Sequence, residues 1–295
     1  MLNAEEARQL DRLALGWLTT PPAPTTAGMR VASVRGFGLE FHDFRRYQPG
    51  DDPRSIDWTI HARLRQLVVK VFQSEAHLRV HLLVDTSASM GSGTPDKLTS
   101  AKKLAALLCY IAAGQHDAVG VATFDDTVRG YVAPATGRSQ LARLFEMLSS
   151  VAPRGRSAAN RALLDYGAVA RGPGLAVVIS DFFEEGGTFE GLRYLLHRGL
   201  TPAVVQVVAP EELDPVVDDE IELVDIEDDD ATPIFVDPQS VASYRERMSQ
   251  LSAGLAEFCT AHGLPWARVD SSFAFSRLLD ACVNAGLVSG RSGSR

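Results

Sequence analysis

The stretch Val80-His81-Leu82-Leu83-Val84-Asp85-Thr86-Ser87-Ala88-Ser89 decides the fold of this 295-residue chain. Its first five residues form an apolar run, interrupted only by His81, that has the length of a strand buried on both faces. The next five place one carboxylate and two hydroxyls at alternate positions of a short loop. The stretch therefore predicts a buried strand that ends in a cluster of polar side chains.

The alternation of apolar strand and helix continues to the end of the chain. Further strands are predicted over residues 119–124, 175–179, 203–208 and 266–269, and helices over 97–113, 140–151, 158–170, 192–197, 241–262 and 273–284. Strands that are apolar on both faces and are separated by helices form a parallel sheet covered on both sides. We therefore expect an α/β fold, a doubly wound, mostly parallel sheet with helices on both faces.

Composition divides the chain into parts. We expect a helix over residues 4–18 and a proline-rich linker within 1–28, followed by an irregular segment with short strands over 29–76. The α/β domain is expected over 77–285, and residues 286–295 are expected to form a flexible tail. An acidic insertion over 209–232 is interpreted as a solvated loop, with a docking surface as the alternative.

Charge and cysteine content exclude several classes of protein. The formal net charge of −8 argues against nucleic-acid binding, which usually needs a clustered basic surface. Cys109, Cys259 and Cys282 are odd in number and lie in apolar helical patterns, which favours buried reduced thiols over disulfides or zinc ligands. The sequence shows neither a secretory signal nor an apolar segment of the roughly 20 residues that span a bilayer. We therefore expect a cytoplasmic protein without an integral membrane segment.

Polar side chains follow two of the predicted strands at their carboxyl ends. Asp85, Ser87 and Ser89 follow the first strand, and Asp181 follows the strand over 175–179. Ligands of open parallel sheets bind beyond the carboxyl ends of the strands, and carboxylate and hydroxyl oxygens suit a hard cation. The sequence therefore predicts a site for Mg²⁺, with Mn²⁺ as the alternative ion. The competing interpretation is that these side chains only cap helices.

This pattern resembles the metal-ion-dependent adhesion site of von Willebrand factor A domains. In that family D-x-S-x-S follows one strand, and Ser-Asp, here Ser180-Asp181, ends a later one. A threonine from a middle loop completes the family's ligand set. This chain has Arg156-Ser157 where the family usually has Gly-Thr, so the resemblance implies Ser157 as the remaining ligand.

A block upstream of the first buried strand resembles a narrower family. It runs from Gly36-Phe37-Gly38 through Asp43-Phe44-Arg45-Arg46-Tyr47-Gln48-Pro49-Gly50-Asp51-Asp52-Pro53-Arg54-Ser55-Ile56-Asp57-Trp58 to Ala62-Arg63. Such a block precedes a von Willebrand-like domain in the bacterial domain-of-unknown-function family numbered 58. Many members of that family have membrane-spanning helices before the block, and more often a small residue in place of His61.

The same block contains a candidate protein interface, because paired arginines and carboxylates make forked, oriented contacts. The alternative, which we favour, is an internal salt-bridge network that holds an irregular segment in place. The residues concerned are Arg45, Arg46, Tyr47, Asp51, Asp52, Arg54, Asp57, Trp58 and Arg63.

The expected function is metal-dependent protein binding without catalysis, in which a partner protein offers a carboxylate to the metal. The resemblance to family 58 implies a MoxR-type AAA ATPase as partner, in protein assembly or maturation. A phosphoryl-transfer hydrolase is the enzyme alternative, but such enzymes generally need a second acidic residue two positions after the nucleophile, where this chain has Ser87. A structural scaffold with a decayed metal site is the remaining alternative.

Overall fold

The computed structural model of the chain describes residues 10, 13–15, 39–48, 56–74, 78–183, 189–213 and 238–290. Contacts divide the chain into two compact units. One unit is Pro24–His77, and the other combines Met1–Ala23 with Leu78–Arg295.

The larger unit is built on a six-stranded sheet with the strand order β6-β5-β4-β7-β8-β9. The strands are β4 (Arg79–Asp85), β5 (Ala118–Phe124), β6 (Val128–Ala135), β7 (Gly174–Ser180), β8 (Leu200–Val208) and β9 (Trp266–Asp270). Five of them are parallel, and β6 runs antiparallel to β5 at one edge. The doubly wound, mostly parallel α/β fold predicted from the apolar strands is therefore confirmed.

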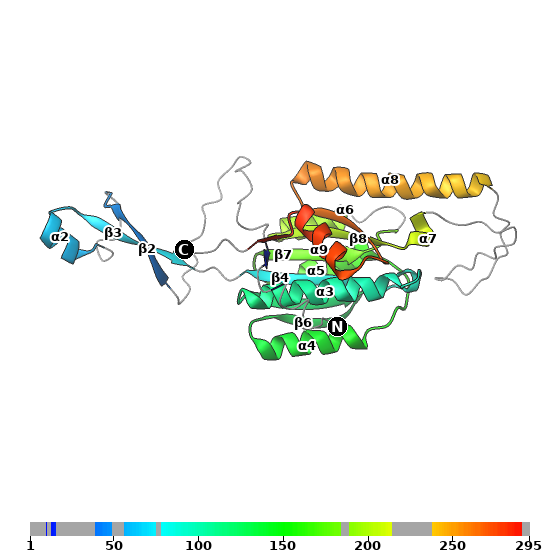
Figure 1. Cartoon of the computed structure of the whole chain (residues 1–295), viewed down its shortest axis with the longest axis horizontal. Helices are drawn as coiled ribbons and strands as arrows, with labels where there is room; N and C mark the ends of the chain where they lie inside the picture. The colour runs from blue at the N-terminus through cyan, green and yellow to red at the C-terminus, as the bar shows by residue number, and fades with distance from the viewer. Residues whose placement is uncertain are drawn as a thin grey trace. The chain divides into compact units, whose positions relative to one another are not determined.

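Apolar side chains fill a separate core on each face of this sheet. Successive side chains of β4 point to opposite faces, so that Leu82 and Val84 pack in one core and Leu83 packs in the other. Helices α3, α4 and α9 cover the first face, and α5, α6 and α8 cover the second (Figure 1). Their bounds are α3 Lys97–Gly114, α4 Arg138–Ser150, α5 Ala159–Val169, α6 Phe189–His197, α8 Pro238–His262 and α9 Phe275–Asn284.

The edge strand β6 was not predicted. Its side chains alternate between half-buried and exposed along its whole length, because only one of its two faces is covered. A strand of this kind lacks the continuous apolar run by which the central strands were recognised.

The two ends of the larger unit also differ from the sequence prediction. Leu13–Leu15, expected within a helix, forms strand β1, which pairs antiparallel with β10 (Val288–Gly290) from the expected tail. Leu15 and Val288 are both buried in the core that lies against α3. Burial of these apolar side chains therefore accounts for the ordered pairing.

The smaller unit contains a hairpin of β2 (Leu39–Arg46) and β3 (Val68–Ser74), joined by a segment that includes α2 (Trp58–Leu64). The short strands agree with the prediction, whereas α2 was not predicted. Asp57 caps this helix, because its carboxylate accepts hydrogen bonds from the backbone N–H groups of Thr59 and Ile60 at 2.8 and 3.1 Å.

The three cysteines are free and buried, as predicted. Burial raises the pKa of the Cys282 thiol to about 12, which keeps it protonated and unreactive at neutral pH. Among the helices of the described residues, none combines the length and the apolar character needed to cross a bilayer.

Candidate metal centre

Asp85 lies where the strand order of the sheet reverses. From β4 the chain passes to β5 and β6 on one side, and then returns to β7, which pairs with the other side of β4. The carboxyl end of the strand at such a switch point is the usual ligand site of an open α/β sheet. Asp85 is the last residue of β4 and therefore occupies this position.

The Asp85 side chain is fully buried, and neutral donors hold both of its oxygens. Oδ1 accepts a hydrogen bond from the backbone N–H of Ser87 at 2.9 Å, and Oδ2 accepts one from the Ser180 hydroxyl at 2.6 Å. Burial and the nearby Asp181 raise the pKa of Asp85 to about 7, although these hydrogen bonds oppose the shift. The site therefore holds a carboxylate whose negative charge is poorly compensated.

The two serines of the loop after β4 bring their hydroxyls together. The Oγ atoms of Ser87 and Ser89 lie 3.1 Å apart. Ser87 is the N-cap of a short 3-10 helix, Ala88–Gly91, which turns the chain tightly at this point. Asp85 and Ser87 are linked through the Ser87 amide, so the structure brings the three residues of the D-x-S-x-S pattern into one loop.

The loop that carries Ser157 is bonded to this loop. The N–H of Ala88 donates to the carbonyl oxygen of Gly155 at 2.8 Å, and the N–H of Arg154 donates to the carbonyl oxygen of Thr86 at 2.8 Å. Ser157 is half-buried and lies two residues before α5. The structure therefore places the Ser157 loop beside the Asp85 loop.

Gly155 is required by the close packing of this loop. Its φ is +73°, and a Cβ atom there would lie 2.8 Å from Oδ2 of Asp125. We expect Gly155→Ala to reduce the free energy of unfolding by about 2 kcal/mol, from left-handed strain together with that contact. Urea unfolding measures the loss.

Gly199→Ala is the matched control, because Gly199 has a φ of +80° and no atom within 4 Å of the added Cβ. The free energy of unfolding of Gly199→Ala should fall by only about 1 kcal/mol. Equal losses in the two variants would show that the contact with Asp125 contributes nothing.

Asp181 follows β7 and is also fully buried. Its Oδ2 accepts from Nζ of Lys97 at 2.7 Å, and its Oδ1 accepts from the backbone N–H of Phe183 at 3.2 Å. Phe182, between Asp181 and Phe183, has a φ of +57°, which is unusual for a bulky residue. Backbone strain of this kind persists where the surrounding structure fixes the conformation, often at functional sites.

Lys97 and Glu212 belong to the same cluster and were not predicted from the sequence. Lys97 is the first residue of α3, and Glu212 lies in α7 (Pro210–Leu213), directly after β8 (Figure 1). The Lys97 Nζ lies 2.5 Å from Oε1 of Glu212, and the Lys97 side chain is fully buried. Burial lowers the pKa of Lys97, but attraction to Asp181 and Glu212 outweighs burial and raises the pKa overall.

The oxygen-rich donor set fits a hard cation such as Mg²⁺. The carboxylates of Asp85 and Asp181 and the paired hydroxyls of Ser87 and Ser89 follow the carboxyl ends of β4 and β7, and the poorly compensated charge of Asp85 favours a positive ion nearby. Within the described residues, no group of three or more His, Cys, Asp or Glu side chains could hold a metal. A site of this type therefore depends on its serine hydroxyls.

Comparison with known proteins places the chain in a family. A family model described as "Protein of unknown function DUF58" matches residues 43–253. The chain belongs to the DUF58 family. This confirms the resemblance carried by the block upstream of β4.

An uncharacterized protein from Mycobacterium tuberculosis is 30% identical to this DUF58 protein over 206 residues, which are 68% of this chain and 62% of that protein. The chain thus spans less than two thirds of the length of this relative. Among solved structures, BatB from Bacteroides thetaiotaomicron is 19% identical, with 69% of this chain and 94% of that chain covered and a TM-score of 0.43. An aerotolerance-related membrane protein from Bacteroides fragilis is 19% identical, with 70% and 98% covered and a TM-score of 0.45.

The candidate interface of this DUF58 protein is only partly described. Trp58 is 60% exposed, Arg46 and Arg63 are exposed, and Tyr47 is half-buried. Asp57 caps α2. Asp51, Asp52 and Arg54 lie outside the described residues, as does the side chain of Arg45.

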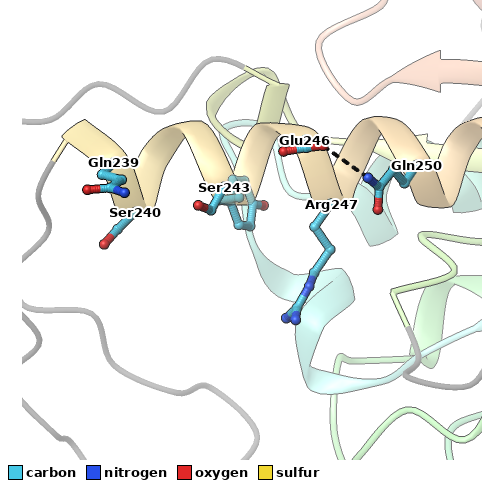
Figure 2. A pocket seen from close by; sticks show the side chains of 7 residues that line it. Gln239, Ser240, Ser243, Glu246, Arg247 and Gln250 are labelled. Atoms are coloured by element: carbon cyan, nitrogen blue, oxygen red, sulfur yellow. Dashed lines mark hydrogen bonds between the residues drawn. The ribbon is translucent and has the colours of Figure 1, made fainter.

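A hollow of about 700 Å³ lies along α8 and is lined by residues of that helix. Figure 2 shows its side chains, including Ser243, Glu246 and Arg247, projecting from one helix, with a hydrogen bond between Glu246 and Gln250. These polar side chains do not converge on one point, so this hollow has the character of a surface groove.

Proposed function

We propose that this DUF58 protein is a metal-dependent protein-binding module whose site takes Mg²⁺, or Mn²⁺, through Asp85, Ser87, Ser89, Ser157 and Asp181. The observation that carries the proposal is the environment of Asp85, a fully buried carboxylate at the switch point of the sheet with neutral donors on both oxygens. A bound divalent ion would supply the positive charge that this environment lacks.

The chain's own residues orient the site. The Ser180 hydroxyl and the Ser87 amide fix the Asp85 carboxylate, and the bond from Ala88 to Gly155 keeps the loop of Ser157 in place. Because hydroxyls supply much of the donor set, the ion retains attraction for a further anionic ligand. A carboxylate from a partner protein fits that role, and it would let a chain of net charge −8 bind an acidic partner.

Family membership supports the next part of the proposal, which concerns the partner. The DUF58 resemblance implies an adaptor that works with a MoxR-type AAA ATPase in protein assembly or maturation in the cytoplasm. Exposed Trp58, in the family-specific block, offers an aromatic anchor of the kind enriched in protein interfaces. Co-purification of the two proteins, compared between the intact chain and Trp58→Ala, tests this partnership.

Catalysis is not part of the proposal. A hydrolase that used Asp85 as nucleophile would need an acid or base two positions later, and Ser87 supplies neither. The Asp85 carboxylate is also fully buried and hydrogen-bonded on both oxygens.

Calorimetric titration with Mg²⁺ tests the metal site. One saturable binding event is expected in the intact protein, and Ser87→Ala and Ser89→Ala are expected to weaken it at least about tenfold through loss of a ligand oxygen. At a Mg²⁺ concentration of about 100 times Kd, the free energy of unfolding should rise by about 2.7 kcal/mol.

Ser149→Ala is the matched control, because Ser149 is exposed on α4 and its hydroxyl donates to the carbonyl oxygen of Glu146 in the same helix. Its affinity should equal that of the intact protein. Absence of binding in the intact protein would contradict the proposed metal site and favour a structural scaffold.

A further inference from the structure

Lys97 is a long, fully buried side chain, and its position is unfavourable for a cation. Burial alone disfavours an ammonium. Lys97 is also the first residue of α3, where the positive end of the helix dipole repels positive charge. A lysine can remain charged here only with strong anionic partners.

Two carboxylates and an aromatic ring contact the Lys97 ammonium. Asp181 and Glu212 accept its hydrogen bonds at 2.7 and 2.5 Å, and the ring of Phe183 lies 4.6 Å from Nζ. Cation–π contact and two carboxylates together offset the loss of water. The ammonium is therefore fixed beside a candidate metal ligand.

Glu212 connects this ammonium to the loop after β4. The Ser92 hydroxyl shares its one proton between two acceptors, the carbonyl oxygen of Ser89 at 2.7 Å and Oε1 of Glu212 at 3.1 Å. The other Glu212 oxygen accepts from the backbone N–H of Ala209 at 2.8 Å. Glu212 is thus held in place by the Ala209 amide and the loop after β4. It can remain paired with Lys97 when Asp181 coordinates a metal ion.

We propose that Lys97 is a positioning residue that acts as the resident cation of the metal site, competing with the divalent ion for Asp181 and so limiting its affinity. The inference rests on the proposed metal-binding function. Asp85, Asp181 and Glu212 with one ammonium leave two formal negative charges, which a single Mg²⁺ balances. Without Lys97 the cluster carries a third negative charge, which holds the metal more tightly and repels a partner's carboxylate.

Lys97→Met tests the proposal, because methionine keeps an unbranched apolar stem and removes the charge. Calorimetric titration should show Mg²⁺ affinity about tenfold tighter, or more, than in the intact protein, since an adjacent positive charge has been removed. Lys97→Arg keeps the charge and should stay near the intact protein. Lys103→Met, an exposed site on the same helix, is the matched control and should leave affinity unchanged.

The outcomes separate this inference from the proposed function. If the intact protein binds Mg²⁺ and a folded Lys97→Met variant binds it equally or more weakly, the inference is overturned and the metal site stands. If only Lys97→Met binds Mg²⁺, competition between Lys97 and the ion is supported, whereas metal binding by the intact protein, and with it the proposed function, is overturned. If neither protein binds Mg²⁺, both proposals are overturned.

A measurement on the intact protein decides the matter if Lys97→Met does not fold. Buried lysine ammonium groups exchange protons slowly enough for ¹H–¹⁵N NMR, and the Lys97 signal is assigned by its loss in Lys97→Arg. Saturation with Mg²⁺ should shift this signal, because the Lys97–Asp181 ion pair weakens when the Asp181 carboxylate binds the metal. An unchanged signal at saturating Mg²⁺ would overturn the inference.

Discussion

Asp85→Asn is expected to stabilise the metal-free protein at pH 8 while abolishing Mg²⁺ binding. Burial and Asp181 raise the pKa of Asp85 to about 7, so the ionised carboxylate destabilises the fold at pH 8. Asparagine keeps the shape and removes the charge. We expect a gain in the free energy of unfolding on the order of 2 kcal/mol, below the limit set by the pKa shift because asparagine accepts weaker hydrogen bonds.

Urea unfolding in the presence of a chelator measures this gain, and its pH dependence gives a second check. A carboxyl whose pKa is raised in the folded state binds more protons folded than unfolded, so its penalty grows between about pH 4 and pH 7. The advantage of Asp85→Asn should therefore shrink as the pH falls through that window. Asp165→Asn, on the exposed face of α5, is the control and should change little. A less stable Asp85→Asn protein at pH 8 would contradict the expectation.

The central strands could be predicted from the sequence because both of their faces are buried. Leu83 and Val84 point to opposite cores, so the strand needs apolar residues at successive positions. The pairing of β4 with both β5 and β7 has no comparable local signal, because it depends on which strands the helices bring together. The edge strand β6 was missed for the opposite reason, since half of its side chains face away from the core.

The candidate site was only partly predictable. Asp85 and Asp181 carry a signal because each directly follows an apolar strand. Lys97 also had a sequence signal, which the prediction did not use. It shares the buried side of α3 with Ala101, Leu104 and Leu108, where a charged residue is unexpected. No sequence pattern singled out Glu212, because it lies in an acidic run that begins at Glu211, where its carboxylate resembles many others. Only the fold shows that it reaches Lys97.

Affinity for Mg²⁺ is expected to rise about tenfold from pH 6 to pH 8 and to level off above pH 8. The proton and the metal compete for the Asp85 carboxylate, and with a pKa of about 7 that group is mostly protonated at pH 6 and mostly ionised at pH 8. Binding should therefore release nearly one proton at pH 6 and very few at pH 8.

Calorimetry in two buffers with different ionisation enthalpies measures this proton release together with the affinity. Ser87→Ala serves as the comparison, because it weakens binding without removing the titrating carboxylate, so its affinity should keep the same pH slope. An affinity that is flat between pH 6 and pH 8 would mean that the ion does not engage Asp85. A slope that remains steep above pH 8 would assign the proton to another group, because Asp85 is already ionised there.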